Sequence, residues 1–370
     1  MKGRINQKKK ISLYLPSLRG GGAERVMLNL ARGFAEKGHV VDLVLAKAEG
    51  PYLNEVPEGI RVVDLNASRV LKSLPGLTRY LRKERPAVLL SALNHANIIA
   101  LWAHKMARVS TKIAISVHST LSISSQKATS IRGRLIPHVI RIFYSWADYI
   151  VAVSQGVAED LAHHANLPRD MIKVIYNPII TPELLEKAKE LLNHPWFNNK
   201  GLPVILGVGR LNKAKDFPTL IRAFNLVCKQ RSVRLLILGE GEERPQLESM
   251  ISELGLKKEV MLPGFVDNPF NYMYNSAVLV FSSAWEGLPT ALVEAMACGC
   301  PVVSTDCPSG PAEILENGKY GPLVPVGNAE ALAQSIISVL DKPPDPLSLQ
   351  QRAAEFSLDK ICRQYLEIIL

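Results

Sequence analysis

The sequence predicts an α/β protein made of two similar halves, each a parallel sheet covered by helices on both faces. Short apolar, strand-like runs alternate with helix-like stretches along the whole chain, which is the βαβ rhythm of parallel sheets. This rhythm breaks over 176–201 and then restarts. The length of 370 residues suits two domains of ordinary size.

The first half, 1–180, is predicted to be one domain with seven strands. Its strand-like runs lie at 11–15, 40–45, 61–65, 87–90, 112–117, 149–153 and 172–175. Helix-like stretches separate most of them, at 23–36, 71–83, 96–108 and 155–164. The regular alternation of the two kinds of segment predicts that these strands run parallel.

The rhythm ends at Tyr-Asn-Pro-Ile-Ile-Thr-Pro, 176–182, and a polar segment follows, so 181–200 is predicted to be a linker. The second half, 201–356, restarts the alternation. Its strands are predicted at 204–207, 233–238, 260–262, 278–281, 302–304 and 322–324, and its helices at 217–230, 244–254, 290–298 and 329–340. A last amphipathic helix is predicted at about 357–370. We expect a ligand site in the cleft between two such halves.

The composition favours a cytoplasmic globular protein. Hydrophobic residues make up 47% of the chain. The chain has no run of 18 apolar residues, so the sequence predicts no membrane-spanning helix. The apolar run after the basic N-terminus is too short for a signal peptide. Five cysteines are few and odd in number, which fits a reducing compartment. Cys298, Cys300 and Cys307 have no histidine or second C-x-x-C nearby, so we expect packing rather than zinc binding.

The positive charge lies in the first half of the chain. Residues 1–200 hold 29 Lys+Arg and 15 Asp+Glu, whereas residues 201–370 hold 15 and 19. The segment 85–147 carries eight Lys/Arg and no acid. Within it, Arg132, Arg134 and Arg141 alternate with apolar side chains, as in a basic amphipathic helix on an anionic membrane surface. A helix packed on its own domain is an equal alternative, and nucleic acid is disfavoured because no nucleic-acid-binding motif is present.

Two carboxylates flank a short loop in Glu286-Gly-Leu-Pro-Thr-Ala-Leu-Val-Glu294. The run 278–281 before this segment predicts a buried strand, and 290–298 a helix. Ligands of open α/β sheets bind at the carboxyl ends of strands, and backbone N–H groups at a helix start accept phosphate. Carboxylates beside an anion site suit a ligand with hydroxyls and a phosphate, such as a nucleotide sugar. For either residue alone, a solvated glutamate is the alternative.

A glycine-containing turn follows the first strand in each half. Gly20, Gly21 and Gly22 open a helix, where backbone can approach an anion closely, although a tight turn alone would also explain them. In the second half, Arg210 and Lys215 follow a Gly-x-Gly turn at a strand end. These two cations could neutralise a diphosphate and stabilise it as a leaving group. Ordinary surface charge is the alternative for each separately.

Two further strand ends carry candidate residues. His118 follows the strand 112–117, where an imidazole can hydrogen-bond a substrate hydroxyl or carbonyl. A structural or exposed histidine is the alternative. Gly264 and Phe265 follow the strand at 260–262 and could frame a planar base by backbone contacts, or could form a plain turn.

These residues together resemble a known family, the retaining family 4 glycosyltransferases of the GT-B fold, of the type that builds bacterial surface glycans. The matching motifs occur in the family's order over positions 20 to 324: Gly-Gly-Gly-Ala-Glu at 20–24, His118, Gly-Arg-Leu at 209–211 with Lys215, Leu-Gly-Glu-Gly at 238–241, Pro-Gly-Phe at 263–265, Glu286 with Glu294, Gly-Cys-Pro-Val-Val-Ser-Thr at 299–305, and Gly-Pro-Leu-Val at 321–324. An ordered set is far more specific than any one motif.

The resemblance implies two Rossmann-like, doubly wound domains facing a central cleft, with the last helix returning to the first domain. It implies that Arg210 and Lys215 bind the diphosphate, and that Glu294 binds the ribose. Glu286 and His118 would contact the sugar. The residues implied for donor binding are Gly21, Gly22, Arg210, Lys215, Gly264, Phe265, Gly287, Leu288, Pro289, Thr290 and Glu294, and those implied for catalysis are His118, Arg210, Lys215 and Glu286. No metal or other cofactor is implied, in line with the absence of a D-x-D motif.

The implied activity is transfer of a sugar from a nucleotide sugar to a glycan or polyprenyl- or other lipid-linked acceptor, with retention of configuration. The segment 306–315 resembles members that use UDP-hexose or UDP-N-acetylhexosamine, although GDP-sugars stay open. The expected location is the cytoplasm, including the inner face of the cell membrane. Alternatives are a nucleotide-sugar epimerase, a non-enzymatic regulatory member of the fold and, disfavoured by chain length, a glycan phosphorylase.

Overall fold

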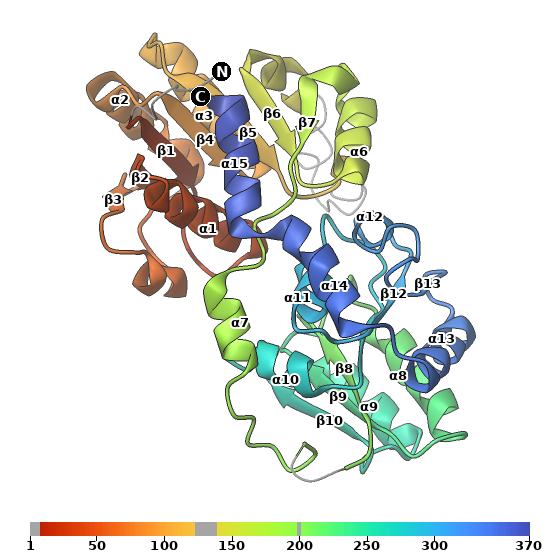
Figure 1. Cartoon of the computed structure of the whole chain (residues 1–370). Coiled ribbons are helices and arrows are strands. Elements are labelled where there is room, and N and C mark those ends of the chain that lie inside the picture. Colours follow the sequence, from red (N-terminus) through yellow and green to blue (C-terminus); the bar gives the residue numbers. More distant parts are fainter. Residues whose placement is uncertain (1–7, 123–138, 198–200) are drawn as a thin grey trace, which may run out of the picture. The chain divides into compact units, whose positions relative to one another are not determined.

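The structure, a computed structural model, describes residues 8–122, 139–197 and 201–370. The chain divides into two compact units (Figure 1). The first comprises Met1–Pro178 with Leu358–Leu370, and the second comprises Ile179–Ser357. Each unit is a parallel sheet with helices, so the predicted α/β class is confirmed.

The first unit contains a seven-stranded parallel sheet. Its strands are β1 Lys10–Leu15, β2 Val40–Leu45, β3 Arg61–Asp64, β4 Val88–Ala92, β5 Lys112–Val117, β6 Tyr149–Ala152 and β7 Ile172–Val174, and its helices include α1 Gly22–Glu36, α2 Leu74–Glu84, α3 Asn94–Ala107, α6 Gln155–Ala165 and α15 Leu358–Ile369. The strand order is β3-β2-β1-β4-β5-β6-β7. The order reverses between β1 and β4, which is where doubly wound sheets bind ligands.

The last helix of the chain completes the core of the first unit. Helix α15 packs beside α1, although most of the sequence separates the two (Figure 1). Tyr365 of α15 meets the ring of Phe34 of α1 edge-on, with ring centroids 6.4 Å apart. The helices approach closely because a Cβ at Gly33 would lie 2.3 Å from Cys362 Sγ. Residues 358–370 are therefore part of the fold of this unit.

The second unit contains a six-stranded parallel sheet with the same kind of winding. Its strands are β8 Val204–Val208, β9 Arg234–Leu238, β10 Val260–Gly264, β11 Val278–Phe281, β12 Val302–Thr305 and β13 Leu323–Val324. The helices described here are α7 Pro182–Ala188, α8 Phe217–Cys228, α9 Arg244–Glu253, α10 Pro269–Asn275, α11 Thr290–Ala297, α12 Pro311–Ile314, α13 Ala329–Asp341 and α14 Pro346–Ala353. The order β10-β9-β8-β11-β12-β13 reverses between β8 and β11.

Four short helices of the second unit, α7, α10, α12 and α14, lie where the alternation of apolar runs gave no helix. All four begin with proline, whose fixed φ suits the first helical position. Helix α7 lies inside the segment expected to be a linker. There it packs against α10, and Asn268 Nδ2 donates to the Lys187 carbonyl at 2.8 Å. The structure therefore places 179–197 in the second unit.

Candidate active site

The candidate site of the second unit lies at the reversal point of its sheet. Strands β8 and β11 are hydrogen-bonded neighbours, although three helices and two strands separate them in the sequence. Lys215 follows β8 and Glu286 follows β11. Because both strands are parallel, their carboxyl ends meet at one edge, and the two side chains come together there.

Lys215 and Glu286 form a partly buried ion pair. The Lys215 Nζ lies 2.6 Å from Glu286 Oε1, and the side chains are 21% and 17% exposed. The Ser283 hydroxyl donates to the same carboxylate oxygen at 2.9 Å. The ammonium also lies 4.9 Å from the centroid of the Phe281 ring, a favourable cation–π distance. The pair is thus held in place by neighbours from β11 and the loop after it.

The loops that carry this pair are joined through their backbones. The Ala284 N–H donates to the Ala214 carbonyl at 2.8 Å. The Ser282 hydroxyl donates to the Lys215 carbonyl, also at 2.8 Å. Asn212 Oδ1 accepts from the Ala214 N–H at 3.1 Å. Both ends of the ion pair are therefore mounted on one hydrogen-bonded framework, which limits the side-chain entropy lost on binding a ligand.

Arg210, the second predicted cation, is placed differently. Its guanidinium lies 3.5 Å from Glu242, and the two side chains are 72% and 62% exposed. An exposed, long ion pair of this kind fixes a side chain weakly. Arg210 follows β8, as the sequence predicted, but the structure leaves its guanidinium in solvent.

Three glycines bring the loops after β8, β9 and β10 close together. The Gly209 N–H donates to the Leu238 carbonyl at 3.0 Å, and the Gly239 N–H donates to the Gly264 carbonyl at 2.8 Å. A Cβ at Gly239 would lie 1.9 Å from the Gly209 carbonyl oxygen, so a larger residue would push the loops apart. Phe265, which follows β10 at this same edge, is 76% exposed.

The loop between Glu286 and α11 is held by the segment that follows β12. The Glu286 N–H donates to the Pro308 carbonyl at 2.7 Å, and its carbonyl accepts from the Ser309 N–H at 3.0 Å. The Ser309 hydroxyl donates to the Gly287 carbonyl at 2.9 Å. Ser309 was absent from the sequence-based candidates, because its partner is fixed only by the tertiary fold.

Helix α11 begins directly after this loop. Leu288 and Pro289 are buried, and Pro289, at the N-cap position, provides no side-chain cap for the first turn, which starts at Thr290. Uncapped N–H groups at a helix start favour an anion. Glu294 lies one turn further along α11 and is half-buried. Strand β11, the loop after it and helix α11 thus form the strand–loop–helix arrangement that the sequence predicted.

The glycine turn of the first unit is already occupied by a side chain. The N–H groups of Gly20 and Gly21 both donate to Glu24 Oε2, each at 2.7 Å. Glu24 is buried at the third position of α1, where its carboxylate accepts from the N–H of the N-cap residue Gly21, as the acidic half of a capping box does. The sequence showed Glu24 within the motif but gave it no role. Around Gly22 the space is open, so Gly22 is the member of this turn that a ligand can approach.

His118 lies just beyond the carboxyl end of β5 in the first unit. Its Nε2 is 3.0 Å from the Ser116 hydroxyl. Burial among protein atoms lowers the pKa of His118 to about 4, so the imidazole is neutral at pH 7. A neutral imidazole has one N–H donor and one acceptor nitrogen.

Three cysteines of the second unit that follow the candidate site are buried. Cys298, Cys300 and Cys307 are all buried. Burial raises the pKa of Cys298 and of Cys307 to about 12, and it also raises the pKa of Cys300. These thiols are therefore protonated at pH 7. In the part of the chain that the structure describes, no cluster of three or more His, Cys, Asp or Glu could hold a metal ion.

The basic segment 85–147 is described only in part, because Arg132 and Arg134 lie outside the described residues. Its described end carries an exposed aromatic and basic surface. Trp146 is exposed and packs edge-on against Phe143, with ring centroids 4.9 Å apart. The Lys105 Nζ lies over the Trp146 ring, 5.6 Å from its centroid. Ile142 and Met106 are exposed nearby in the sequence. As far as the described helices go, none is long and apolar enough to span a bilayer.

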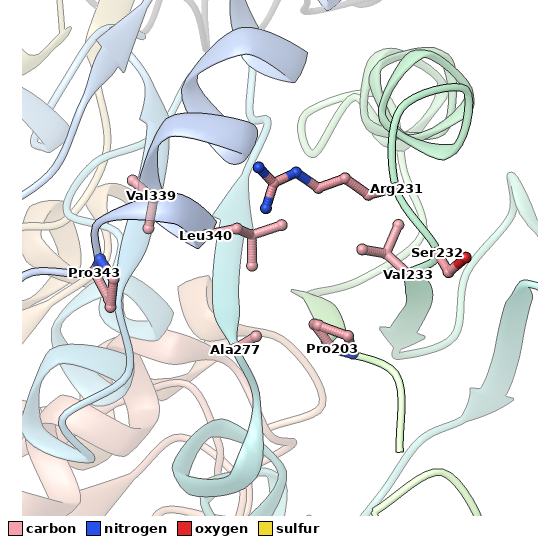
Figure 2. A pocket seen from close by; sticks show the side chains of 8 residues that line it. All are labelled: Pro203, Arg231, Ser232, Val233, Ala277, Val339, Leu340 and Pro343. Atoms are coloured by element: carbon pink, nitrogen blue, oxygen red, sulfur yellow. The ribbon is translucent and has the colours of Figure 1, made fainter. Parts of the chain in front are cut away.

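A separate hollow of about 440 Å³ lies at the opposite edge of the second sheet. Its walls come from residues that precede β8, β9 and β11, among them Pro203, Val233 and Ala277 (Figure 2). Arg231, its charged side chain, is ion-paired with Asp341. Because this hollow lies at the amino ends of the strands, it is distinct from the candidate site at their carboxyl ends.

Two family profiles match the chain. Residues 20–182 match the profile described as Glycosyltransferase Family 4, and residues 189–356 match the profile described as Glycosyl transferases group 1. The boundary between these matches falls near the boundary between the two units.

Two relatives with assigned names are similar over nearly the whole chain. A Campylobacter jejuni protein named N-acetylgalactosamine-N,N'-diacetylbacillosaminyl-diphospho-undecaprenol 4-alpha-N-acetylgalactosaminyltransferase is 32% identical, with 98% of this chain and 99% of that protein covered. The Rhizobium meliloti lipopolysaccharide core biosynthesis glycosyltransferase LpsE is 27% identical, with 94% and 96% covered.

Solved structures share the fold. HepE from Anabaena, in complex with UDP, gives a TM-score of 0.79 at 21% identity, covering 97% of this chain and 98% of that one. The apo form of WaaB, a lipopolysaccharide outer core galactosyltransferase, gives a TM-score of 0.75 at 21% identity, covering 97% and 99%. At these identities the likeness concerns the fold.

Proposed function

Because the chain belongs to the glycosyltransferases of the GT-B fold, we propose that it transfers a sugar from a UDP-sugar to a lipid-linked or glycan acceptor in surface-glycan synthesis. The proposal of a lipid-linked acceptor is supported by the Campylobacter jejuni relative, whose name specifies a diphospho-undecaprenol acceptor. The proposal of a UDP-sugar is supported by HepE, which was solved with UDP. A hexose or N-acetylhexosamine is the sugar class that we favour, with a GDP-sugar as the competing donor.

The observation that carries this proposal is the Lys215–Glu286 pair in the loops that lead to the start of α11, where the N-cap residue Pro289 provides no side-chain cap. The Lys215 ammonium, partly offset by the Glu286 carboxylate, and the start of the helix provide positive charge where a diphosphate would bind. The adjacent carboxylates of Glu286 and Glu294 provide acceptors for the hydroxyls of the sugar and the ribose. We therefore assign the diphosphate to Lys215, Arg210 and the N–H groups near Leu288, and the hydroxyls to the two glutamates.

The proposed reaction exchanges one bond at the anomeric carbon of the sugar for another. The bond from this carbon to the diphosphate oxygen breaks, and a bond to the acceptor oxygen forms on the same face, so configuration is retained. The proton of the acceptor hydroxyl passes to the departing diphosphate. Lys215 and the start of α11 stabilise the negative charge that grows on the leaving group. The neutral ring of His118 donates a hydrogen bond to the sugar.

A thermal-shift screen against UDP, GDP, ADP and their common sugar conjugates tests this proposal. A ligand at 100 times its Kd should stabilise the folded protein by ~2.7 kcal/mol. We expect the strongest shift with UDP or a UDP-sugar. A stronger response to GDP would show that the donor is a GDP-sugar and not a UDP-sugar. No response to any nucleotide would contradict the assigned site. The transferase activity is then tested by measuring sugar transfer from the donor that gave the shift to an acceptor. An epimerase or a regulatory protein would bind the nucleotide sugar without transferring its sugar.

We also propose that the aromatic and basic surface formed by Lys105, Met106, Ile142 and Trp146 contacts anionic lipid. Exposed apolar side chains beside Lys105 and Arg141 match the chemistry of an anionic bilayer surface. The protein should sediment with anionic liposomes at low salt and less so at high salt. Trp146→Ser should weaken this binding, and Trp196→Ser in the second unit is the control. Equal sedimentation of both variants and the unchanged protein would contradict this surface.

A further inference from the structure

A row of three polar side chains leads from the last helix of the chain to His118. The Tyr365 hydroxyl of α15 lies 3.4 Å from the Ser116 hydroxyl of β5. The Ser116 hydroxyl lies 3.0 Å from His118 Nε2. Tyr365 and Ser116 are buried, so water does not replace either contact freely. The row connects the core of the first unit with the residue at the tip of β5.

The backbone geometry explains why these groups meet. Ser116 and His118 are two residues apart on an extended segment, so their side chains point to the same face of the sheet. That face is covered by α15, which brings Tyr365 against Ser116. The Ser116 main chain is held as well, because Asn97 Nδ2 donates to its carbonyl at 3.0 Å. Ser116 is therefore fixed by both its backbone and its side chain.

A neutral imidazole carries its N–H proton on one of its two ring nitrogens. The hydrogen bond that one nitrogen makes determines which of the two is protonated. A tyrosine hydroxyl is more acidic than a serine hydroxyl, so Tyr365 is the better donor of the two. If Tyr365 donates to Ser116, the serine proton is free to donate to His118 Nε2. The Nε2 then acts as an acceptor, and the ring proton must lie on Nδ1.

We propose that Ser116, supported by Tyr365, is a positioning residue that holds His118 in the Nδ1–H tautomer, so that Nδ1 donates a hydrogen bond to the substrate. This inference rests on the proposed function only for its catalytic consequence. The tautomer is a property of the protein without ligand. Neither Ser116 nor Tyr365 need touch the substrate, because each acts through the ring of His118.

The tautomer can be measured directly by long-range ¹⁵N–¹H correlation in histidine-labelled protein. The chain has 8 histidines, and His118→Gln identifies the signals of His118 by their loss. We expect the Nδ1–H pattern for His118 in the unchanged protein, and a loss of this preference in Ser116→Ala. An Nε2–H pattern in the unchanged protein would overturn the proposal, as would an identical pattern in Ser116→Ala.

Ser91→Ala is a matched control for Ser116→Ala. Ser91 is a fully buried serine on β4, the strand next to β5, and its hydroxyl has no hydrogen-bond partner among the described residues. The two variants make the same change at the same depth in one sheet. Ser91→Ala should leave the tautomer of His118 unchanged, and a similar change in both variants would show a general packing effect and overturn the proposal.

The kinetic consequence separates positioning from stability. In the presence of a nucleotide sugar and acceptor, Ser116→Ala should lower kcat by about fivefold to tenfold, which is what one hydrogen bond accounts for. The KM for the donor should change little. Tyr365→Phe should act in the same direction but less. If the unchanged protein transfers no sugar, the proposed function fails, while the tautomer measurement still decides the role of Ser116.

Discussion

Replacing Lys215 by alanine should lower the turnover of the best donor about 10²-fold to 10³-fold, the usual cost of removing one group that stabilises developing charge. The ammonium is partly buried and held 2.6 Å from Glu286 Oε1, so its position is set before any ligand binds. Fixed charge at this point costs no reorganisation during the reaction. Steady-state kinetics with saturating acceptor would show the loss mainly in kcat.

Lys213→Ala is the control for this substitution. Lys213 lies two residues away on the same loop, but its side chain is exposed, and exposed single charges contribute little. Its removal should change kcat less than about twofold. Near-normal turnover of the Lys215→Ala variant would refute the assignment of Lys215. Equal losses in the two variants would indicate a general effect of the positive charge on this loop.

The strands, and the position of Lys215 and Glu286 at strand ends, were predictable from the sequence, whereas their ion pair was not. Strands buried on both faces of a parallel sheet form continuous apolar runs, and each predicted strand agrees with the structure to within about two residues. Residues directly after parallel strands share one edge of the sheet. The order of the strands, which places β8 beside β11, came from the structure.

The proline-initiated helices were not predicted, because the apolar alternation gives no signal for a helix of four to eight residues. The available signal was local. Thr181, Asn268 and Asp345 each precede a proline, and each side chain caps the helix that this proline begins. At 176–182 the prolines instead suggested the start of a linker. A cap residue followed by proline was the information that distinguished a helix start from a break.

The different settings of Arg210 and Lys215 could not be predicted either. Both are cations on the loop after β8, and the sequence treats them alike. The structure shows that Lys215 is enclosed by the loop after β11, whereas Arg210 extends into solvent. The position of the Glu24 side chain in the first unit could not be predicted for the same reason. Its carboxylate fills the turn at Gly20 and Gly21, which depends on side-chain placement that spacing alone does not fix.

Glu286→Gln should separate nucleotide binding from sugar transfer. In the unchanged protein the Glu286 carboxylate neutralises Lys215 and accepts a second hydrogen bond from Ser283. Glutamine keeps the size and one carbonyl acceptor but removes the negative charge. Lys215 then has a full charge to offer a diphosphate, so UDP affinity should rise about threefold to tenfold. Turnover should nevertheless fall by about 10²-fold, because the proposed contact with the sugar loses the negative charge of the carboxylate.

This opposite movement of affinity and turnover is the informative outcome, because simple damage to the site would lower both. Calorimetric titration with UDP gives the affinity, and steady-state transfer gives kcat. Glu248→Gln is the control, since Glu248 forms an exposed ion pair with Arg244 on α9 and should change neither quantity. If Glu286→Gln weakened UDP binding, the carboxylate would be holding the nucleotide itself, or holding Lys215 in its binding position. If turnover stayed normal, Glu286 would have no role at the sugar, and Lys215 alone would define the site.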